Sequence, residues 1–339
     1  MAPKRRGAGR VTLAEVAASA GVSTMTVSRF FNSPDKVSPA QRERIAQVVA
    51  ETGYVPNQAA GGLASAHNRI VGMVVPNISG PIFAPTIQAF SDTLGEHGYQ
   101  VLLASSYFSA EQEERAVRAF LGWAPAALVV TSHFHTEATE RMLEQAALPV
   151  LETWDYRPER QPVQIGFSHY DVGMLAAAAV HAAGYDRPAF VLNSATGDLS
   201  ALERCQGFKD GLSAKGITVQ VHAPAAELAH FEAGEQAMQV LLAGSAPVDV
   251  IFFANDNLAA GGLLAAQHAG IRVPEHCAVL GFGDYPFARM LMPRLTTIRP
   301  PALEIGTLAA QQILEAVDGA QVSNITGPLH CELIKRDSL

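Results

Sequence analysis

The sequence predicts an α/β protein with a small all-helical head and a larger body made of two doubly wound parallel-sheet subdomains. Before residue 54, apolar residues recur at helical spacing between capping residues, whereas from residue 69 onward short β-branched runs alternate with helical patterns. Such alternation of strand and helix is typical of parallel sheets with right-handed crossovers and helices on both faces. A chain of 339 residues, 48% of them apolar and 17% charged, has room for two or three well-buried domains.

The first two helices of the head are predicted around a tight turn. Thr12 can cap the first helix with its hydroxyl, and Gly21 ends it because glycine enters the left-handed conformation without a Cβ penalty. Ser23 starts the second helix, whose Val27 and Phe30 can pack back onto the first. This is the layout of a helix-turn-helix, in which the second helix enters the DNA major groove. The alternative is a plain αα-hairpin in which Ser and Thr serve only as caps.

A third helix completes the predicted head. Ser38 and Pro39 have the residue types of an N-cap and a first helical position, and Gly53 follows the last apolar position. The next residues are rich in Gly, Pro and small polar side chains and have no periodicity. The predicted organisation is a basic flexible arm at 1–10, a DNA-binding domain at 11–56, a hinge or linker at 57–68 and a body at 69–339.

The body is predicted from two series of strands and helices. The first has strands at 70–76, 100–106, 127–132 and 149–153, with helices ending near 97 and spanning 111–121 and 136–147. The second has strands at 189–193, 218–223, 250–255 and 278–283, with helices at 199–215, 231–242 and 257–268, and an extra helix at 171–183 joins the two series. These series predict one subdomain at about 69–162 and 291–323 and another at about 163–290 and 324–339. Ligands of such folds bind at the carboxyl ends of the strands, so we expect a cleft that a hinge can close.

Charge and cysteine usage limit the classes of function. Residues 1–66 hold eight Lys/Arg and four Asp/Glu, which gives a charge of +4. Because the net charge of the whole chain is −8, the remaining residues carry −12. A basic head on an acidic body favours a polyanion bound at the head. The three cysteines are far apart and form no CxxC, so we expect no disulfide framework and no metal site. The sequence has no apolar run long enough for a membrane helix or an export signal, which predicts a cytoplasmic protein.

The residues of the head carry a family resemblance. VTLAEVAASAGVSTMTVSRFFN (11–32) and VSPAQRERIAQVVAETGYVPN (37–57) resemble the lactose-repressor (LacI) family of bacterial transcription regulators. ANDNLAAGGLLAAQHAGIRVPE (254–275), VLGFGDYPFARMLMPRLTTI (279–298) and RCQGFKDGL (204–212) agree with it, and MTVSRFFN, EHGYQ and VQIGF are most similar to the gluconate-operon repressors. The resemblance implies a periplasmic-binding-protein-like body, a small effector in its cleft and a near-palindromic operator. It also implies a homodimer or a dimer of dimers; without a long C-terminal heptad helix, the dimer is favoured.

The resemblance assigns DNA contacts in the head. Thr24 and Met25 stand where the family reads base edges, and Arg29 can reach a base or the backbone. Met25 is apolar, so its expected contact is a thymine methyl group. The positions that contact phosphates in the family are Thr12, Ser23, Thr26, Ser28, Asn32 and Tyr54.

The linker keeps part of the family pattern. Asn57 and Leu63 are present, and Leu63 is expected to wedge into the minor groove; the alternative is a plain linker residue. Gly61 and Gly62 replace the Arg and small polar residue that are common in the family. Each Gly costs roughly 1 kcal/mol of helix propensity relative to Ala, so the sequence predicts a hinge that is disordered without DNA.

The resemblance also assigns an effector site. Arg204 takes the position of an effector-binding Arg, although without the resemblance it would be read as a surface residue in an i,i+4 pair. Asn255 ends a strand at the lip of the cleft, and Asp256 is expected to cap the next helix. The further candidates follow strands or lie in the first crossover: Trp154, Asp155, Thr131 and Phe83.

GFGD, residues 281–284, bears on the class of effector. The family often has an Asp where Gly283 stands, and that carboxylate accepts from neutral sugar hydroxyls. A buried Asp would repel a sugar acid, so its loss favours an anionic effector such as gluconate or a related aldonate, with or without a phosphate. Asp284 either points inward or forms a turn.

The predicted function is a DNA-binding regulator, expected to be a repressor, of genes for carbohydrate or sugar-acid catabolism. The alternative is a periplasmic-type sugar-binding protein without a regulatory role. An enzyme is not expected, because the sequence has no GxSxG, no P-loop and no GxGxxG after a strand. No cofactor is expected; His133 and His135 lack a third ligand nearby in the sequence. The sequence leaves open whether the effector induces or co-represses.

Overall fold

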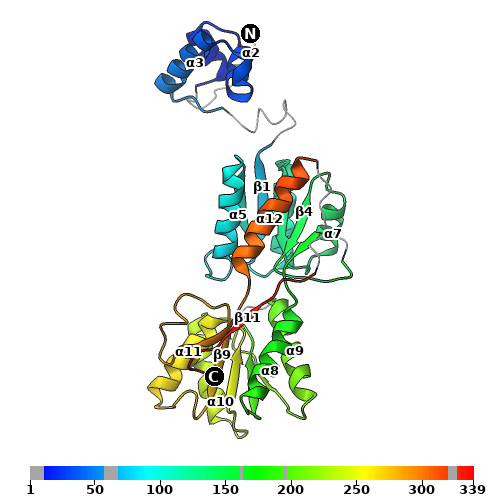
Figure 1. Ribbon diagram of the computed structural model, residues 1–339, viewed down its shortest axis with the longest axis vertical. Coiled ribbons are helices and arrows are strands. Elements are labelled where there is room, and N and C mark those ends of the chain that lie inside the picture. The colour runs from blue at the N-terminus through cyan, green and yellow to red at the C-terminus, as the bar shows by residue number, and fades with distance from the viewer. Residues whose placement is uncertain (1–10, 57–67, 161–162, 194–196, 320–326) are drawn as a thin grey trace. The chain divides into compact units, whose positions relative to one another are not determined.

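The computed structural model describes residues 11–56, 68–160, 163–193, 197–319 and 327–339 (Figure 1). The chain divides into two compact units, Met1–Asn68 and Arg69–Leu339, which are the head with the linker and the body. The predicted arm at 1–10 and most of the predicted linker, including Asn57, Gly61, Gly62 and Leu63, lie outside the described residues.

The head has the predicted helix-turn-helix, with helices α1 (Leu13–Ala20), α2 (Thr24–Asn32) and α3 (Pro39–Thr52). Thr12 and Glu15 form a reciprocal capping box at the start of α1, and Gly21 ends α1 with a φ of 62°. Ser23 caps α2 by accepting from the backbone N–H of Thr26. The predicted caps are thus confirmed, although the Ser38 side chain makes no capping hydrogen bond. The short 3-10 helix η1 (Pro34–Lys36) was not predicted.

A small apolar core holds the head together. Val27 on α2 and Val16 on α1 are fully buried, and Phe30 packs against this core as predicted. Ile45 brings α3 into the same cluster. The buried members of this cluster are Val16, Ala17, Ala20, Val27, Val37, Ile45 and Tyr54. None of the described residues of the head is both charged and buried.

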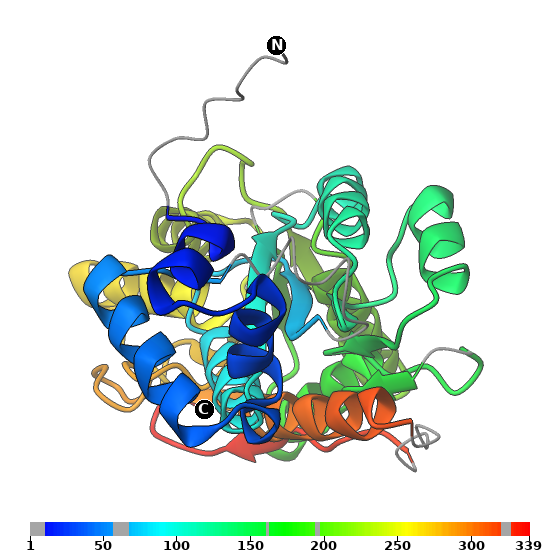
Figure 2. The ribbon, with the colours of Figure 1, turned by 90° about the horizontal axis from the view of Figure 1, so that it is seen from above.

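The first sheet of the body is wholly parallel, with strand order β2-β1-β3-β4-β5. Its strands are β1 (Ile70–Val75), β2 (Gln100–Ser105), β3 (Ala127–Thr131), β4 (Val150–Thr153) and β5 (Val163–Ile165). The helices of this subdomain are α5 (Ala84–Glu96), α6 (Ala110–Gly122), α7 (Glu137–Glu144) and α12 (Ala302–Val317). Alternate residues of β1 face opposite layers, because Met73 packs in the cluster of α5 while Val74 packs with Phe120 of α6. Helices α5 and α12 lie side by side (Figures 1 and 2).

The second sheet has the order β11-β10-β9-β8-β6-β7 and is parallel except for β11 at one edge. Its strands are β6 (Pro188–Val191), β7 (Gln220–His222), β8 (Val250–Phe253), β9 (Ala278–Phe282), β10 (Thr296–Arg299) and β11 (Glu332–Ile334). The helices are α8 (His169–Ala182), α9 (Leu199–Ser213), α10 (His230–Ala243) and α11 (Asp256–His268). Helix α8 pairs with α9, and α10 pairs with α11. None of the described helices is long and apolar enough to cross a membrane.

The chain changes subdomain at positions that differ from the expected ones. Strand β5 pairs with β4 in the first sheet, although 163–165 was expected in the second subdomain. Strand β10 pairs with β9 in the second sheet, although 291–299 was expected in the first. Both strands are short, and their place is decided by a partner strand rather than by their own pattern. The elements α12 and β11 were also absent from the predicted series.

Candidate functional sites

The second helix of the head presents a polar outer surface. Met25 is 62% exposed, and Thr24, Arg29 and Asn32 are exposed around it. Opposite them, Val27 is buried in the core of the head. Helix α2 therefore offers to solvent the residues that were predicted to read bases, and their contacts with DNA stay a prediction.

The short polar residues of the head also bond locally. The Ser23 hydroxyl lies 2.9 Å from the Thr26 hydroxyl, and the Asn32 amide donates to Ser28 Oγ over 3.4 Å. The Thr12 hydroxyl donates to Glu15 Oε2 over 2.9 Å. These groups keep solvent-facing lone pairs and are compatible with phosphate contacts, which stay predictions.

Tyr54 has a different environment from the other predicted phosphate contacts. It is only 8% exposed, and its ring packs against Phe31 with centroids 6.0 Å apart. Its ring therefore belongs to the core of the head, so a phosphate contact could come only from its hydroxyl.

A cavity of about 290 Å³ lies between the two subdomains of the body, at the carboxyl ends of their strands. Five of the predicted effector residues line it: Phe83, Thr131, Trp154, Arg204 and Asn255. Asp155, Gly283 and Asp284 do not line it. The sequence did not single out several residues that do, among them Glu113, His169, Asp198, His230 and Tyr285.

Arg204 projects from α9 and is only 4% exposed, which excludes the reading as a surface residue. Helices α8 and α9 approach closely here, because a Cβ on Gly207 would lie 2.0 Å from the carbonyl oxygen of Tyr170. The guanidinium donates to His169 Nδ1 over 2.9 Å and to the carbonyl of Ala254 over 3.2 Å. Within the described residues its Nε has no hydrogen-bond partner and no carboxylate forms an ion pair with it, whereas its Cζ lies 4.3 Å from the centroid of the Phe282 ring. Burial lowers the pKa of Arg204, and the charges of Asp198 and Glu203 offset only part of this effect.

His169 is a neutral hydrogen-bond partner of Arg204. It is buried, and its pKa is lowered to about 3 by burial and by the charge of Arg204. The imidazole is therefore neutral at pH 7 and accepts from Arg204 at Nδ1. A neutral partner orients the guanidinium without cancelling its charge. The part of the cavity next to Arg204 therefore favours an anionic group.

Trp154 and Phe83 form an aromatic wall on the first subdomain. Their ring centroids are 4.8 Å apart at 67°, and Trp154 is 3% exposed. Trp154 adopts a φ of 68° directly after β4, as Ser132 does with a φ of 67° directly after β3. Such strained backbone costs about 1–3 kcal/mol and clusters at ligand sites. The indole Nε1 of Trp154 is buried with no partner among the described residues, which leaves it free to donate to a ligand.

Asn255 and His230 complete the cavity at the second sheet. Asn255 caps α11 by accepting from Leu258 N over 3.1 Å, and its amide nitrogen lies 3.3 Å from His230 Nδ1. Asp256 was expected to be this cap. Instead it is fully buried, with Thr297 Oγ1 donating to it over 2.6 Å and Tyr285 N over 2.8 Å. Burial raises the pKa of Asp256 to about 7.

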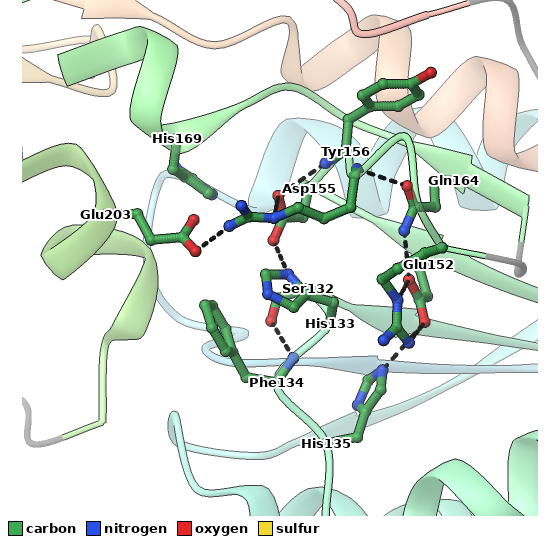
Figure 3. Close-up of polar contacts among 12 residues, drawn as sticks. Ser132, His133, Phe134, His135, Glu152, Asp155, Tyr156, Gln164, His169 and Glu203 are labelled. Atoms are coloured by element: carbon green, nitrogen blue, oxygen red, sulfur yellow. Dashed lines mark hydrogen bonds and ion pairs between the residues drawn. The ribbon is translucent and has the colours of Figure 1, made fainter. Parts of the chain in front are cut away.

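Asp155 lies beside the cavity rather than in its lining. It accepts from the His133 imidazole and from Tyr156 N over 2.8 Å (Figure 3). Burial alone would raise the pKa of Asp155, but the hydrogen bond from His133 and nearby cations lower it. Arg157 lies 3.7 Å from Asp155 and pairs with Glu203 of α9, so this cluster ties the first subdomain to the helix that carries Arg204.

The structure corrects the expectation for Gly283 and Asp284. A Cβ on Gly283 would lie 2.4 Å from the Tyr285 ring, so Tyr285 fills the space of a side chain at 283. Asp284 accepts from Arg299 Nε over 2.7 Å and from Arg336 Nη2 over 2.6 Å. These two cations hold Asp284 away from the cavity. The second cation comes from a residue 52 positions later, which no local pattern could reveal.

Comparisons with known proteins support the architecture. Residues 12–57 match the bacterial regulatory proteins of the lacI family, and residues 177–339 match a periplasmic binding protein-like domain. The HTH-type transcriptional regulator GntR of Pseudomonas aeruginosa is 35% identical over 338 residues, which are 98% of this chain and 97% of that protein.

Two solved structures are also similar. A LacI-family regulator from Silicibacter pomeroyi has a TM-score of 0.90 at 30% identity, covering 97% of this chain and 99% of that one. The transcription regulator GntR from Chromobacterium violaceum has a TM-score of 0.74 at 29% identity, covering 79% of this chain and 98% of that one. This identity over nearly the whole length confirms the resemblance read from the sequence. The chain belongs to the LacI family and is a DNA-binding transcriptional regulator of the GntR type, not an enzyme.

Proposed function

We propose that this regulator controls genes of sugar-acid catabolism and that a small sugar acid, such as gluconate or a related aldonate, binds in the cleft and sets its affinity for the operator. The observation that carries the proposal is the buried guanidinium of Arg204, which has no carboxylate partner among the described residues. A buried cation without a counter-ion is unfavourable by several kcal/mol, and an anionic ligand removes that penalty.

The remainder of the cavity suits a hydroxylated carbon chain. Trp154 and Phe83 offer an aromatic wall against which C–H groups can pack. Asn255 and His230 offer polar groups on the opposite subdomain. This combination supports a sugar acid over a purely apolar acid, because a sugar acid has C–H groups for the aromatic wall and hydroxyls for the polar groups.

Ligand and DNA are proposed to be linked through the two subdomains. A ligand that contacts Arg204 on one subdomain and Trp154 on the other binds one relative orientation of them more tightly, and so shifts the population toward it. In a homodimer, the two bodies hold the two heads at the separation of two DNA half-sites. A conformational change in the bodies then alters the free energy needed to bring both heads onto those half-sites. A periplasmic-type sugar-binding protein without a regulatory role does not account for the helix-turn-helix head.

The experiment is calorimetry on the full-length protein with gluconate, 2-ketogluconate and glucose. We expect both acids to bind and the neutral hexose not to bind. Binding of glucose with no binding of either acid, or of the phosphate esters of these acids, would refute the proposal.

The link to DNA is tested with a site selected from a random DNA library. Fluorescence anisotropy at fixed salt is measured with and without gluconate, since protein–DNA affinity depends steeply on salt. We expect the ligand to change the affinity for the selected site; an unchanged affinity at saturating ligand contradicts the linkage.

A further inference from the structure

We infer that the cleft selects a sugar acid with one charged end, so that its carboxylate meets Arg204 while an uncharged hydroxyl end meets Glu113, and a phosphate at that end is rejected. This inference rests on the proposed function and specifies its ligand. The first observation is the charge of the lining. Among the described lining residues, Arg204 is the only Lys or Arg, whereas Glu113 and Asp198 are both acids. The cavity can therefore compensate one anionic group but not two.

Most helix N-termini at the cavity already carry a carboxylate. Helices α5, α6, α8, α9, α10 and α11 all begin at its lining, and a helix N-terminus often binds phosphate. Five of them have an acid at the cap or in the first turn, whereas α5 has none. Glu111 and Glu113 lie in the first turn of α6, Asp256 lies in that of α11, and Asp198 caps α9 by accepting from Ala201 N over 3.0 Å. These acids use or offset the positive ends of the helix dipoles.

Glu113 is fixed in the wall of the first subdomain. It is 5% exposed, and its Oε1 accepts from His135 Nδ1 over 2.5 Å. His135 Nε2 lies 3.5 Å from Glu152, toward which its ring points in Figure 3. Burial alone would lower the pKa of His135, but the hydrogen bond to Glu113 and the nearby carboxylate of Glu152 raise it to about 9. His135 is therefore a cation that holds the Glu113 side chain in place.

The network behind Glu113 keeps this wall negative. Arg160 pairs with Glu152 and, over 3.1 Å, with Glu140. Three carboxylates (Glu113, Glu152, Glu140) then face two cations (His135, Arg160), a sum of −1. Both cations lie behind Glu113 and do not line the cavity. A carboxylate held this way accepts well from a hydroxyl, and it repels a phosphate, which carries about −1.5 to −2 charges at pH 7.

The test is a calorimetric comparison of gluconate with 6-phosphogluconate on the full-length protein. We expect gluconate to bind at least about tenfold more tightly, the size of a like-charge contact in a desolvated site. The Glu113→Gln variant removes the charge and keeps an acceptor for His135, so the ratio of the two affinities should fall toward one. Glu114→Gln on the same helix is the matched control, because Glu114 bonds Thr136 and Arg118 outside the cavity and its loss should leave the ratio unchanged.

Each outcome has a definite reading. If the wild type binds 6-phosphogluconate as tightly as gluconate or more tightly, this inference is overturned and the proposed function stands. If neither acid binds and glucose does, both are overturned. If Glu113→Gln folds by circular dichroism but keeps the wild-type ratio, Glu113 does not select the ligand and the inference fails. Should that variant not fold, the wild-type ratio alone decides.

Discussion

The head and the body of this regulator place their functional side chains in opposite environments. On α2 of the head, Met25 and Arg29 are exposed on one short helix. In the body, Arg204 and Trp154 are almost fully buried, and they come from two subdomains. The head can therefore meet a large rigid partner at its surface, whereas the cavity of the body can enclose a small ligand and exclude water from it.

The difference extends to electrostatics. The described head has no buried charge, and its apolar core is small. The body buries Arg204, Glu113, Glu152 and Asp155 and satisfies most of them through networks. The stability of the head should thus depend on packing, and that of the body partly on protonation. The predictions below separate the two regions on these grounds.

The largest expected effect is on packing in the head. Ile45 is fully buried and joins α3 to the core of the head. Ile45→Ala should cost about 2–5 kcal/mol, which is comparable to the whole stability of so small a domain. We expect DNA binding to be lost and the head to become protease-sensitive, while the thermal transition of the body is unchanged. Val55→Ala is the control, because Val55 is 79% exposed and should leave DNA binding intact. Normal DNA binding by Ile45→Ala would show that the head does not depend on this core.

The second prediction removes ligand binding by the body and leaves DNA binding by the head unchanged. Arg204→Gln removes the buried cation, and we expect gluconate affinity to fall by about 100-fold or more, since losing one partner of a buried charge contact costs roughly 2–5 kcal/mol. Binding to DNA without ligand should be unchanged. Arg187→Gln is the matched control, because its side chain is 56% exposed. Calorimetry and anisotropy on the same preparations measure both quantities. Equal gluconate binding by Arg204→Gln and Arg187→Gln would remove Arg204 from the site.

The same contrast explains what could be predicted from the sequence. The head is specified by local signals: Thr12 with Glu15, and Gly21 after α1, act over three or four residues and can be read directly. Helix limits there agree closely with prediction. In the body the alternation of strands and helices is also local, so most strands were found, and Arg204 and Trp154 could be proposed from the family resemblance.

The features of the body that the sequence did not predict depend on contacts between segments far apart in the chain. Strand β10 is assigned by its pairing with β9, and Asp284 is turned away from the cavity by Arg336. Glu113 was not singled out from the sequence, and its burial and its pairing with His135 show that it faces inward. No spacing along the chain encodes these pairs, so the polar network around the cleft had to come from the structure.

The third prediction sharpens the electrostatic difference. The folded pKa of His135, raised to about 9, lies above its ordinary value of 6.5. Its contribution is therefore fully present below pH 6.5 and is lost as pH rises through 9, a change on the order of 2 kcal/mol. Denaturant titrations of the full-length protein between pH 7 and 9 should show the body losing stability and the head staying constant. His135→Gln should flatten this dependence. A wild-type slope that persists in the variant would mean that another group titrates in this window.

The smallest expected effect concerns the reading surface itself. Because Met25 is 62% exposed on α2, replacing it changes the surface and not the fold. Met25→Gln exchanges an apolar contact for a group that can bond adenine with two hydrogen bonds. We expect affinity for the site selected by the wild type to fall about tenfold, while affinity for random DNA changes by less than about twofold, because phosphate contacts supply the latter. Parallel library selections with both proteins, and anisotropy on each selected site, measure the shift. Met174→Gln, an exposed Met of the body, is the control. Equal losses on selected and random DNA would show that position 25 supports binding without reading bases, and the head would then obtain its specificity from other residues of α2.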